Sequence, residues 1–333
     1  GELTIRQAEK VAKLARVPFG FLFLETPPTA TKPTIPDLRR VVGATPLSED
    51  FFEVLADATA KQQWFIDYLR EGGAEPLPFV GRFQFATRPE IKIVADDIRR
   101  TLGITVTDRT SSADADAYFR LLADRAEDKG ILVMKSGIVR ASTRRRLSEI
   151  EFRGFAIAHP MAPLVFVNGQ DAVVASAFTL MHEVTHIWLG ESGVSDLSPA
   201  TDRAIEVFCN AVSAELLVPN DEFLARWRAL SNIEALAKMF RVSRAVIARR
   251  AFDNQLITWP EFEVYLTPPP AKPRDPGGDP FRTIPVRNSK RLTRAVVGSA
   301  LSGETLLREA ANLLNSRPDT VIKLGSRIFG REA

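Results

Sequence analysis

Two of the three histidines in the chain lie four residues apart, and an acidic residue directly follows the first of them. His182, Glu183 and His186 form the pattern His-Glu-x-x-His. Because residues four apart lie on one face of a helix, both imidazoles can bind one metal ion while the carboxylate lies beside them. The pattern is typical of zinc peptidases, in which the acid between the ligands is the general base.

The segment around this pattern is apolar. Residues 172–190 contain no ionisable side chain other than Glu183 and the two histidines, which predicts a largely buried helix whose polar groups need partners. One interpretation is a pair of core histidines that bind backbone carbonyls. The metal site is favoured, because an ordinary buried helix would not bring two imidazoles and a carboxylate together.

A catalytic zinc ion needs a third protein ligand and one open position. Glu206 is the main candidate, because it lies in the middle of an apolar helix predicted over residues 201–217, with Asn210 one turn later on the same face. A carboxylate in such a position must be paired if it is buried. Glu215 is the alternative, although its place near the helix end also suits a capping or solvated role.

These residues resemble a known family. The stretch HEVTHIWLG, followed by ESGVSD and EVFCNAVSAELLVP, is similar to the ImmA/IrrE metallopeptidases over about residues 149–219. The resemblance implies that His182, His186 and Glu206 bind the metal and that Glu183 is the catalytic base. It further implies a zinc-dependent endopeptidase that cleaves a helix-turn-helix repressor and so derepresses a stress, prophage or mobile-element operon.

Other site residues are less sharply indicated. Asn210 is a candidate to support a metal ligand, and His159 and Asn168 are candidates to bind substrate. The strand predicted at residues 163–168 could pair with an extended substrate, or could be an ordinary strand of a sheet. A second group that stabilises the oxyanion is expected, with His159, Tyr265 and backbone amides as alternatives.

Composition limits the remaining possibilities. The chain has 333 residues, of which 45% are hydrophobic, and no apolar run is long enough for a membrane helix, so we expect a soluble protein. Its single cysteine, Cys209, excludes an internal disulfide and fits a reducing cytoplasm. The net charge of +3 is modest, so any contact with nucleic acid must depend on local patches.

The order of predicted elements indicates an α+β fold that is mostly helical, with a small sheet packed on the zincin-like active-site helix. Helices are predicted at 48–70, 87–102 and 111–129, and strands at 131–134, 150–158 and 163–168. The expected organisation is the end of a helix-turn-helix-like domain at 1–30, a helical region at 31–130, the zinc peptidase core with helix-turn-helix-like helices at 131–266, a linker at 267–280 and a small basic module at 281–333.

Both ends of the chain raise a possible role in binding. The first residues are similar to the closing helices of a Cro/repressor-type domain, which suggests a fragment, although a single docking helix would look the same. Basic clusters at residues 140–146 and from Arg282 to Arg294 suit solvated surfaces, an acidic partner or nucleic acid. We expect the metal site to survive removal of everything after Pro268.

A second class of function fits part of the pattern. The chain could be a DNA-binding transcriptional regulator or an antitoxin-like component whose metal site is structural. The helix-turn-helix pattern at residues 230–258 is then one candidate for binding DNA. Glu183 separates the two classes, because a structural metal site needs no general base beside its ligands. The intact acid favours the peptidase.

Overall fold

The computed structural model describes residues 4–8, 22–23, 47–195, 203–266 and 278–330. The chain divides into two compact units, Gly1–Pro33 and Thr34–Ala333. Most of the first unit, and with it most of the expected helix-turn-helix remnant, lies outside the described residues. The second unit contains all of the structure discussed below.

A mixed sheet of four strands lies inside the second unit, in the order β1-β3-β2-β4. β1 (Leu132–Ser136) pairs in parallel with β3 (Leu164–Asn168). β2 (Gly154–Ile157) is antiparallel both to β3 and to β4 (Gly193–Ser195). β3 therefore has a neighbouring strand on each side, and β4 lies at an edge of the sheet.

Both faces of the sheet are covered by helices. Along β3, Val165 and Val167 belong to one hydrophobic core, while Leu164 and Phe166 belong to another. Successive side chains of a strand point to opposite faces, so this alternation places one core on each side of the sheet. A strand buried on both faces reads as a continuous apolar run, which explains why the sequence predicted it.

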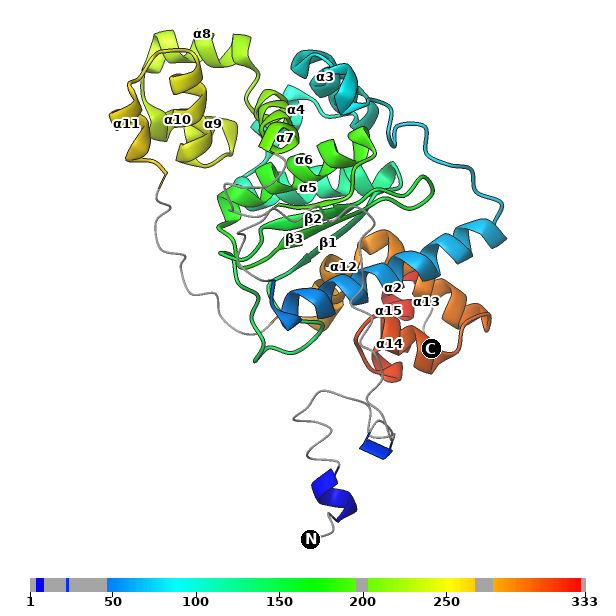
Figure 1. Cartoon of the computed structure of the whole chain (residues 1–333). Helices are drawn as coiled ribbons and strands as arrows, with labels where there is room; N and C mark the ends of the chain where they lie inside the picture. The colour runs from blue at the N-terminus through cyan, green and yellow to red at the C-terminus, as the bar shows by residue number, and fades with distance from the viewer. Residues whose placement is uncertain (1–3, 9–21, 24–46, 196–202, 267–277, 331–333) are drawn as a thin grey trace. The chain divides into compact units, whose positions relative to one another are not determined.

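Helices α5 (Ala115–Asp128) and α6 (Val173–Leu189) cover one face (Figure 1). α6 contacts β2, β3 and α5, and α7 (Arg203–Leu217) packs against its other side. α3 (Ile91–Leu102) packs against α7 in turn. The helix that carries both histidines is thus enclosed between the sheet and further helices.

The opposite face is covered by α2 (Glu49–Glu71) and by helices from the end of the chain, α12 (Pro280–Asn288) and α13 (Lys290–Ser302) (Figure 1). The rings of Phe155 and Phe166 stack at 4.9 Å between centroids in this core. Segments more than 200 residues apart in the sequence therefore form one hydrophobic core with the sheet.

This packing changes one expectation. The C-terminal helices bury Leu292, Val296 and Val297 of α13 against the same core that contains the strands. Removal of everything after Pro268 would expose that face of the sheet to water. We therefore no longer expect the metal site to survive such a truncation, because the site depends on the sheet that these helices cover.

The remaining helices are short. α9 (Ile233–Phe240) and α10 (Arg244–Asp253) are the two short helices predicted within residues 230–258. The fold class is α+β and mostly helical, as predicted. None of the described helices is long and apolar enough to cross a membrane. The remaining elements are η2 (Phe85–Thr87), α4 (Val106–Ser111), α8 (Asn220–Leu230), α11 (Trp259–Glu263), α14 (Leu307–Leu313) and α15 (Pro318–Phe329).

Candidate metal centre

His182 and His186 lie one turn apart on α6, in a stretch that is buried at every position from Thr179 to Leu189. The two residues are 4% and 3% exposed. Their Nε2 atoms are 3.2 Å apart, so both rings present the same nitrogen to one point. The spacing of four residues produces the convergence that the sequence predicted.

The far end of α6 is held in place by backbone contacts. The N–H groups of Gly81 and Phe83 donate to the last carbonyl groups of the helix, those of Ile187 and Trp188, at 3.0 and 3.1 Å. The helix ends at Gly190, which has a φ of 71° and lies so close to Gly81 that a Cβ on Gly190 would be 3.0 Å from the Gly81 Cα. Glycine is needed at position 190 because its φ is left-handed and because a side chain there would come too close to Gly81.

Glu206 of α7 completes the cluster. One carboxylate oxygen lies 2.9 Å from the His182 Nε2 atom, and the other lies 3.2 Å from the His186 Nε2 atom. The Glu206 side chain is 21% exposed, so it closes the side of the cluster that is nearest to solvent. The structure thus brings together the three residues expected to bind the metal.

Asn210 fixes the orientation of the first imidazole. Its Oδ1 atom lies 3.0 Å from the His182 Nδ1 atom. An amide oxygen can only accept a hydrogen bond, so the Nδ1 atom must carry the proton. With a metal ion bound, the ring would be neutral and would coordinate through the lone pair of its Nε2 atom.

The charges in the cluster stabilise one another. Burial lowers the pKa of His182, but the hydrogen bond to Glu206 and the charges of Glu183 and Glu206 outweigh burial, so the pKa lies above its ordinary value. Burial raises the pKa of Glu206, but hydrogen bonds from both histidines outweigh it, so that pKa lies well below its ordinary value. Glu206 is therefore a carboxylate throughout the physiological range, as a metal ligand must be.

The donor set fits a divalent metal. The ligand atoms of His182, His186 and Glu206 all lie within 4.8 Å of one another. Four ligands at about 2.0–2.1 Å around a tetrahedral ion are roughly 3.3 Å apart, close to the distances seen here. Two imidazole nitrogens and one carboxylate oxygen form a set that is typical of zinc sites with an open fourth position.

Glu183 lies fully buried beside this cluster, and its position depends on a glycine in the sheet. A Cβ on Gly154 of β2 would lie 2.8 Å from the Glu183 Oε1 atom, 2.8 Å from the Phe166 carbonyl oxygen and 2.9 Å from the Thr179 Cγ2 atom. The carboxylate therefore rests directly on the backbone of β2. Gly154 is not among the site residues predicted from the sequence, because only the packing of α6 on β2 brings it close to Glu183.

Two neighbouring residues are excluded from the metal set. Glu215 accepts from the Asn220 N–H at 3.3 Å, at the start of α8, and pairs with Arg250 at 2.9 Å, which is the capping role considered as the alternative. Cys209 is fully buried, and burial raises the pKa of its thiol. It is a core residue that stays protonated.

The candidates for substrate binding lie at opposite ends of the β2–β3 pair. Asn168 is fully buried, and its side chain donates to the carbonyls of Ser148 and Phe152 at 3.1 and 3.0 Å. His159 follows the other end of β2, where its Nδ1 atom accepts from the Met161 N–H. Burial and the charge of Arg70 hold the pKa of His159 below its ordinary value.

Of the two interpretations of residues 163–168, the ordinary strand of a sheet is confirmed, and the pairing of this strand with substrate is not possible. β3 is bonded to β1 on one side and to β2 on the other, so neither of its edges is open. The strand that lies both at an edge and at the site is β4, where a Cβ on Gly193 would be 3.7 Å from the His186 Cε1 atom. The sequence of β4 is too short to have predicted a strand.

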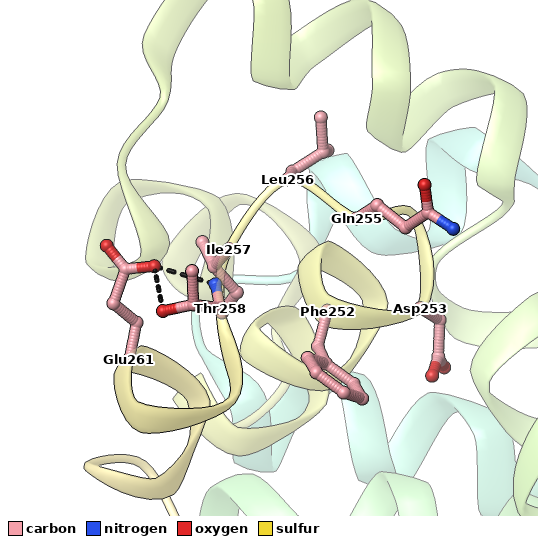
Figure 2. A pocket seen from close by; sticks show the side chains of 7 residues that line it. All are labelled: Phe252, Asp253, Gln255, Leu256, Ile257, Thr258 and Glu261. Carbon is pink, nitrogen blue, oxygen red and sulfur yellow. Dashed lines mark hydrogen bonds between the residues drawn. The ribbon is translucent and has the colours of Figure 1, made fainter.

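A hollow on the surface lies away from these residues, between α10 and α11 (Figure 2). None of the predicted site residues lines it. Two carboxylates line it. Glu261 accepts hydrogen bonds from the N–H and hydroxyl of Thr258, both at 2.7 Å, and so caps α11, while Asp253 accepts from the Arg249 Nε–H at 2.8 Å. Both carboxylates that line the hollow therefore have partners within the chain.

The helix with His-Glu-x-x-His, the carboxylate from the following helix and the mixed sheet beneath them define a metallopeptidase of the zincin type. Residues 126–252 match the family model of peptidase M78, described as the IrrE N-terminal-like domain, which supports a metallopeptidase of the ImmA/IrrE type. Residues 288–327 match a domain of unknown function, DUF8813. No curated protein and no solved structure matches the chain.

Proposed function

We propose that the chain is a zinc-dependent endopeptidase. The observation that carries the proposal is the convergence of His182, His186 and Glu206, with ligand atoms 2.9–3.2 Å apart, beside the fully buried Glu183. The family match supports a metallopeptidase with a metal cofactor. The choice of zinc rests on the chemistry of the donor set.

A zinc ion held by these residues would lower the pKa of a water molecule to about 7 and polarise the scissile carbonyl. Glu183 then acts as the general base, taking a proton from the attacking water and giving it to the leaving amine. Its place against the Gly154 backbone restricts its movement, so it is held ready for proton transfer. Asn210 holds the His182 ring in the orientation that the ligand role needs.

The substrate backbone is proposed to lie along β4. Among the described strands, β4 is the one at the edge of the sheet next to the site, and it pairs with β2 alone. An extended peptide can pair with such an edge through backbone hydrogen bonds. Gly193 near the His186 ring would leave room for the peptide to approach the metal cluster.

The substrate is proposed to be a helix-turn-helix repressor in the cytoplasm, whose cleavage derepresses a stress, prophage or mobile-element operon. Support comes from the resemblance to the ImmA/IrrE family and from the single cysteine, which suits a reducing compartment. The other candidate, a regulator or antitoxin-like component with a structural metal, needs a fourth protein ligand. The described residues supply three.

The test is a comparison of the zinc-loaded protein with its Glu183→Gln variant. Both are incubated with a peptide library prepared from a digested lysate, and new amino termini are identified by mass spectrometry. They are also incubated with a repressor encoded beside the gene. The parent should cleave and the variant should lose about 10²-fold or more of the rate, the usual contribution of a general base. Equal cleavage by both proteins would remove Glu183 from the mechanism.

A further inference from the structure

Two large apolar side chains lie on the surface where α13 meets α15. A Cβ on Gly298 of α13 would lie 3.5 Å from the Phe329 Cζ atom of α15, and a Cβ on Gly325 of α15 would lie 2.5 Å from the Leu301 Cδ1 atom of α13. Each glycine thus makes room for a side chain of the other helix. Leu301 and Phe329 are held in place by these contacts, yet they are 47% and 37% exposed.

Two more exposed leucines follow directly after α13. The chain turns back at once, since the N–H groups of Glu304 and Thr305 both donate to the Ser299 carbonyl, at 3.0 and 3.1 Å. Leu306 and Leu307 come next, at the start of α14, which contacts α13. They are 74% and 36% exposed.

These four side chains are called the leucine patch below, and they are Leu301, Leu306, Leu307 and Phe329. Single exposed apolar residues are ordinary on a protein surface, but a group of them marks a site of interaction. Contact with another apolar surface is favourable by roughly 25 cal/mol for each Å² removed from water. The patch therefore suits a protein partner.

The charged residues beside the patch are balanced in sign. Arg294 lies one turn before Gly298 on α13, over the Phe329 ring at 5.1 Å, and Glu304 follows the other end of the helix. α14 adds Arg308 and Glu309. All four of these charged residues are exposed, and none forms an ion pair with a residue that the structure describes. A rim with equal numbers of both signs fits a second copy of the same surface better than a strongly charged partner.

The positions of two of these charges suit an antiparallel pair of α13 helices. Residue 299 is midway between Arg294 and Glu304, and it lies next to Gly298 and near Leu301. At 1.5 Å per residue, the two charges are roughly 7 Å on either side of this point. A twofold axis through it brings Arg294 of each copy to Glu304 of the other.

We propose that the chain forms a symmetric dimer through the leucine patch, with the α13 helices of the two copies antiparallel. The apolar side chains pack against one another around the twofold axis, and two ion pairs between Arg294 and Glu304 lie at the rim. Because the patch is small, the dimer is a weak one, with a Kd of about 10 µM.

Sedimentation velocity of the full chain between about 1 and 100 µM measures the association. Arg294→Glu and Glu304→Arg each turn both ion pairs into contacts between like charges, while the double variant Arg294→Glu/Glu304→Arg restores two pairs with their signs exchanged. The matched control is Lys323→Glu, which makes the same change of charge as Arg294→Glu at an exposed position. Lys323 lies about 200° around α15 from Gly325, the residue that contacts α13.

A further variant keeps the test valid if a charge reversal disturbs folding, which circular dichroism would show. Leu306→Ser removes the most exposed side chain of the leucine patch. Because Leu306 is the residue that caps the start of α14, and serine is a preferred residue there, this variant should be at least as stable as the parent.

The parent should dimerise, and each single charge reversal and Leu306→Ser should weaken the dimer about tenfold or more. The double charge exchange should return the Kd to within about threefold of the parent, and Lys323→Glu should associate like the parent. A parent that stays monomeric at about 100 µM would overturn the proposal and leave the patch to a different protein. Single reversals without effect, or a double exchange that associates no better than the single variants, would also overturn it.

Discussion

Substitution of the glycine beneath the catalytic acid tests how the sheet positions the site. In Gly154→Ala, the new Cβ would be 2.8 Å from the Glu183 Oε1 atom and 2.8 Å from the Phe166 carbonyl oxygen. The second contact is with the backbone of a central strand, which cannot move without disturbing the sheet. The carboxylate, at the end of a side chain, must therefore move together with the strands.

The expected cost is that of overpacking a core, about 1–3 kcal/mol. For a unit of this size, 1 kcal/mol lowers Tm by about 2–4 °C, so a fall of a few degrees is expected. Displacement of the general base should also lower kcat by about tenfold or more, because general-base catalysis contributes 10²–10⁴-fold and depends on position. Zinc content should not change, since Glu183 is not a ligand.

The matched control is Gly193→Ala, in which the Cβ would be 3.7 Å from the His186 Cε1 atom, an ordinary contact. It should keep the Tm and the metal content of the parent. Differential scanning fluorimetry and metal analysis compare the two variants, and peptide cleavage compares Gly154→Ala with the parent, because Gly193 lies where the substrate is proposed to bind. If Gly154→Ala is as stable and as active as the parent, Glu183 does not depend on the backbone of β2 and the positioning argument is refuted.

Three further predictions follow from other contacts. Asn210→Ala should weaken metal affinity about 10–100-fold by chelator competition, because the His182 ring loses its partner, while the exposed Asn312→Ala should have no effect. Burial raises the pKa of Glu127 to about 7, against hydrogen bonds from Ser289, Lys290 and Arg291. The folded state then binds more protons than the unfolded state between the two pKa values, so stability in urea should fall by about 3 kcal/mol as the pH rises from about 4.5 to above 7. Glu127→Gln should lack this fall, and an equal pH dependence in both proteins would contradict the assignment. A chain truncated after Leu266 loses five buried aliphatic side chains of α13 and α15, whose burial contributes roughly 10 kcal/mol to folding at about 2 kcal/mol each. The truncated chain should therefore be unfolded or aggregated when measured by circular dichroism and gel filtration. A folded, zinc-binding fragment would show that these helices are dispensable.

The sequence predicted the elements that its local patterns specify. The helix with His182 and His186 follows from an apolar run and the spacing of its polar residues, and Glu206 with Asn210 follows from the same periodicity in α7. α2, expected at residues 48–70, begins at Glu49 because the Ser48 side chain accepts from the Phe51 N–H and caps it. These signals depend on neighbours within a few turns of the chain.

Features set by long-range packing could not be predicted. The contact of Gly154 with Glu183 exists only where α6 meets β2, and β4 is three residues long without a distinct apolar pattern. The position of β3 inside the sheet depends on its parallel pairing with β1, which decides between the two interpretations of residues 163–168 in favour of an ordinary strand. The C-terminal helices looked like a separate module because their apolar faces do not reveal which surface they cover.

The most direct test of the central claim is the zinc content of the purified protein after chelation, reloading and dialysis, measured by mass spectrometry for the parent and for His186→Ala. The account predicts about one zinc per chain in the parent, since His182, His186 and Glu206 form one set of ligands, and almost none in the variant, which keeps only two of them. A parent without zinc under these conditions, or a variant with an undiminished content, would contradict it.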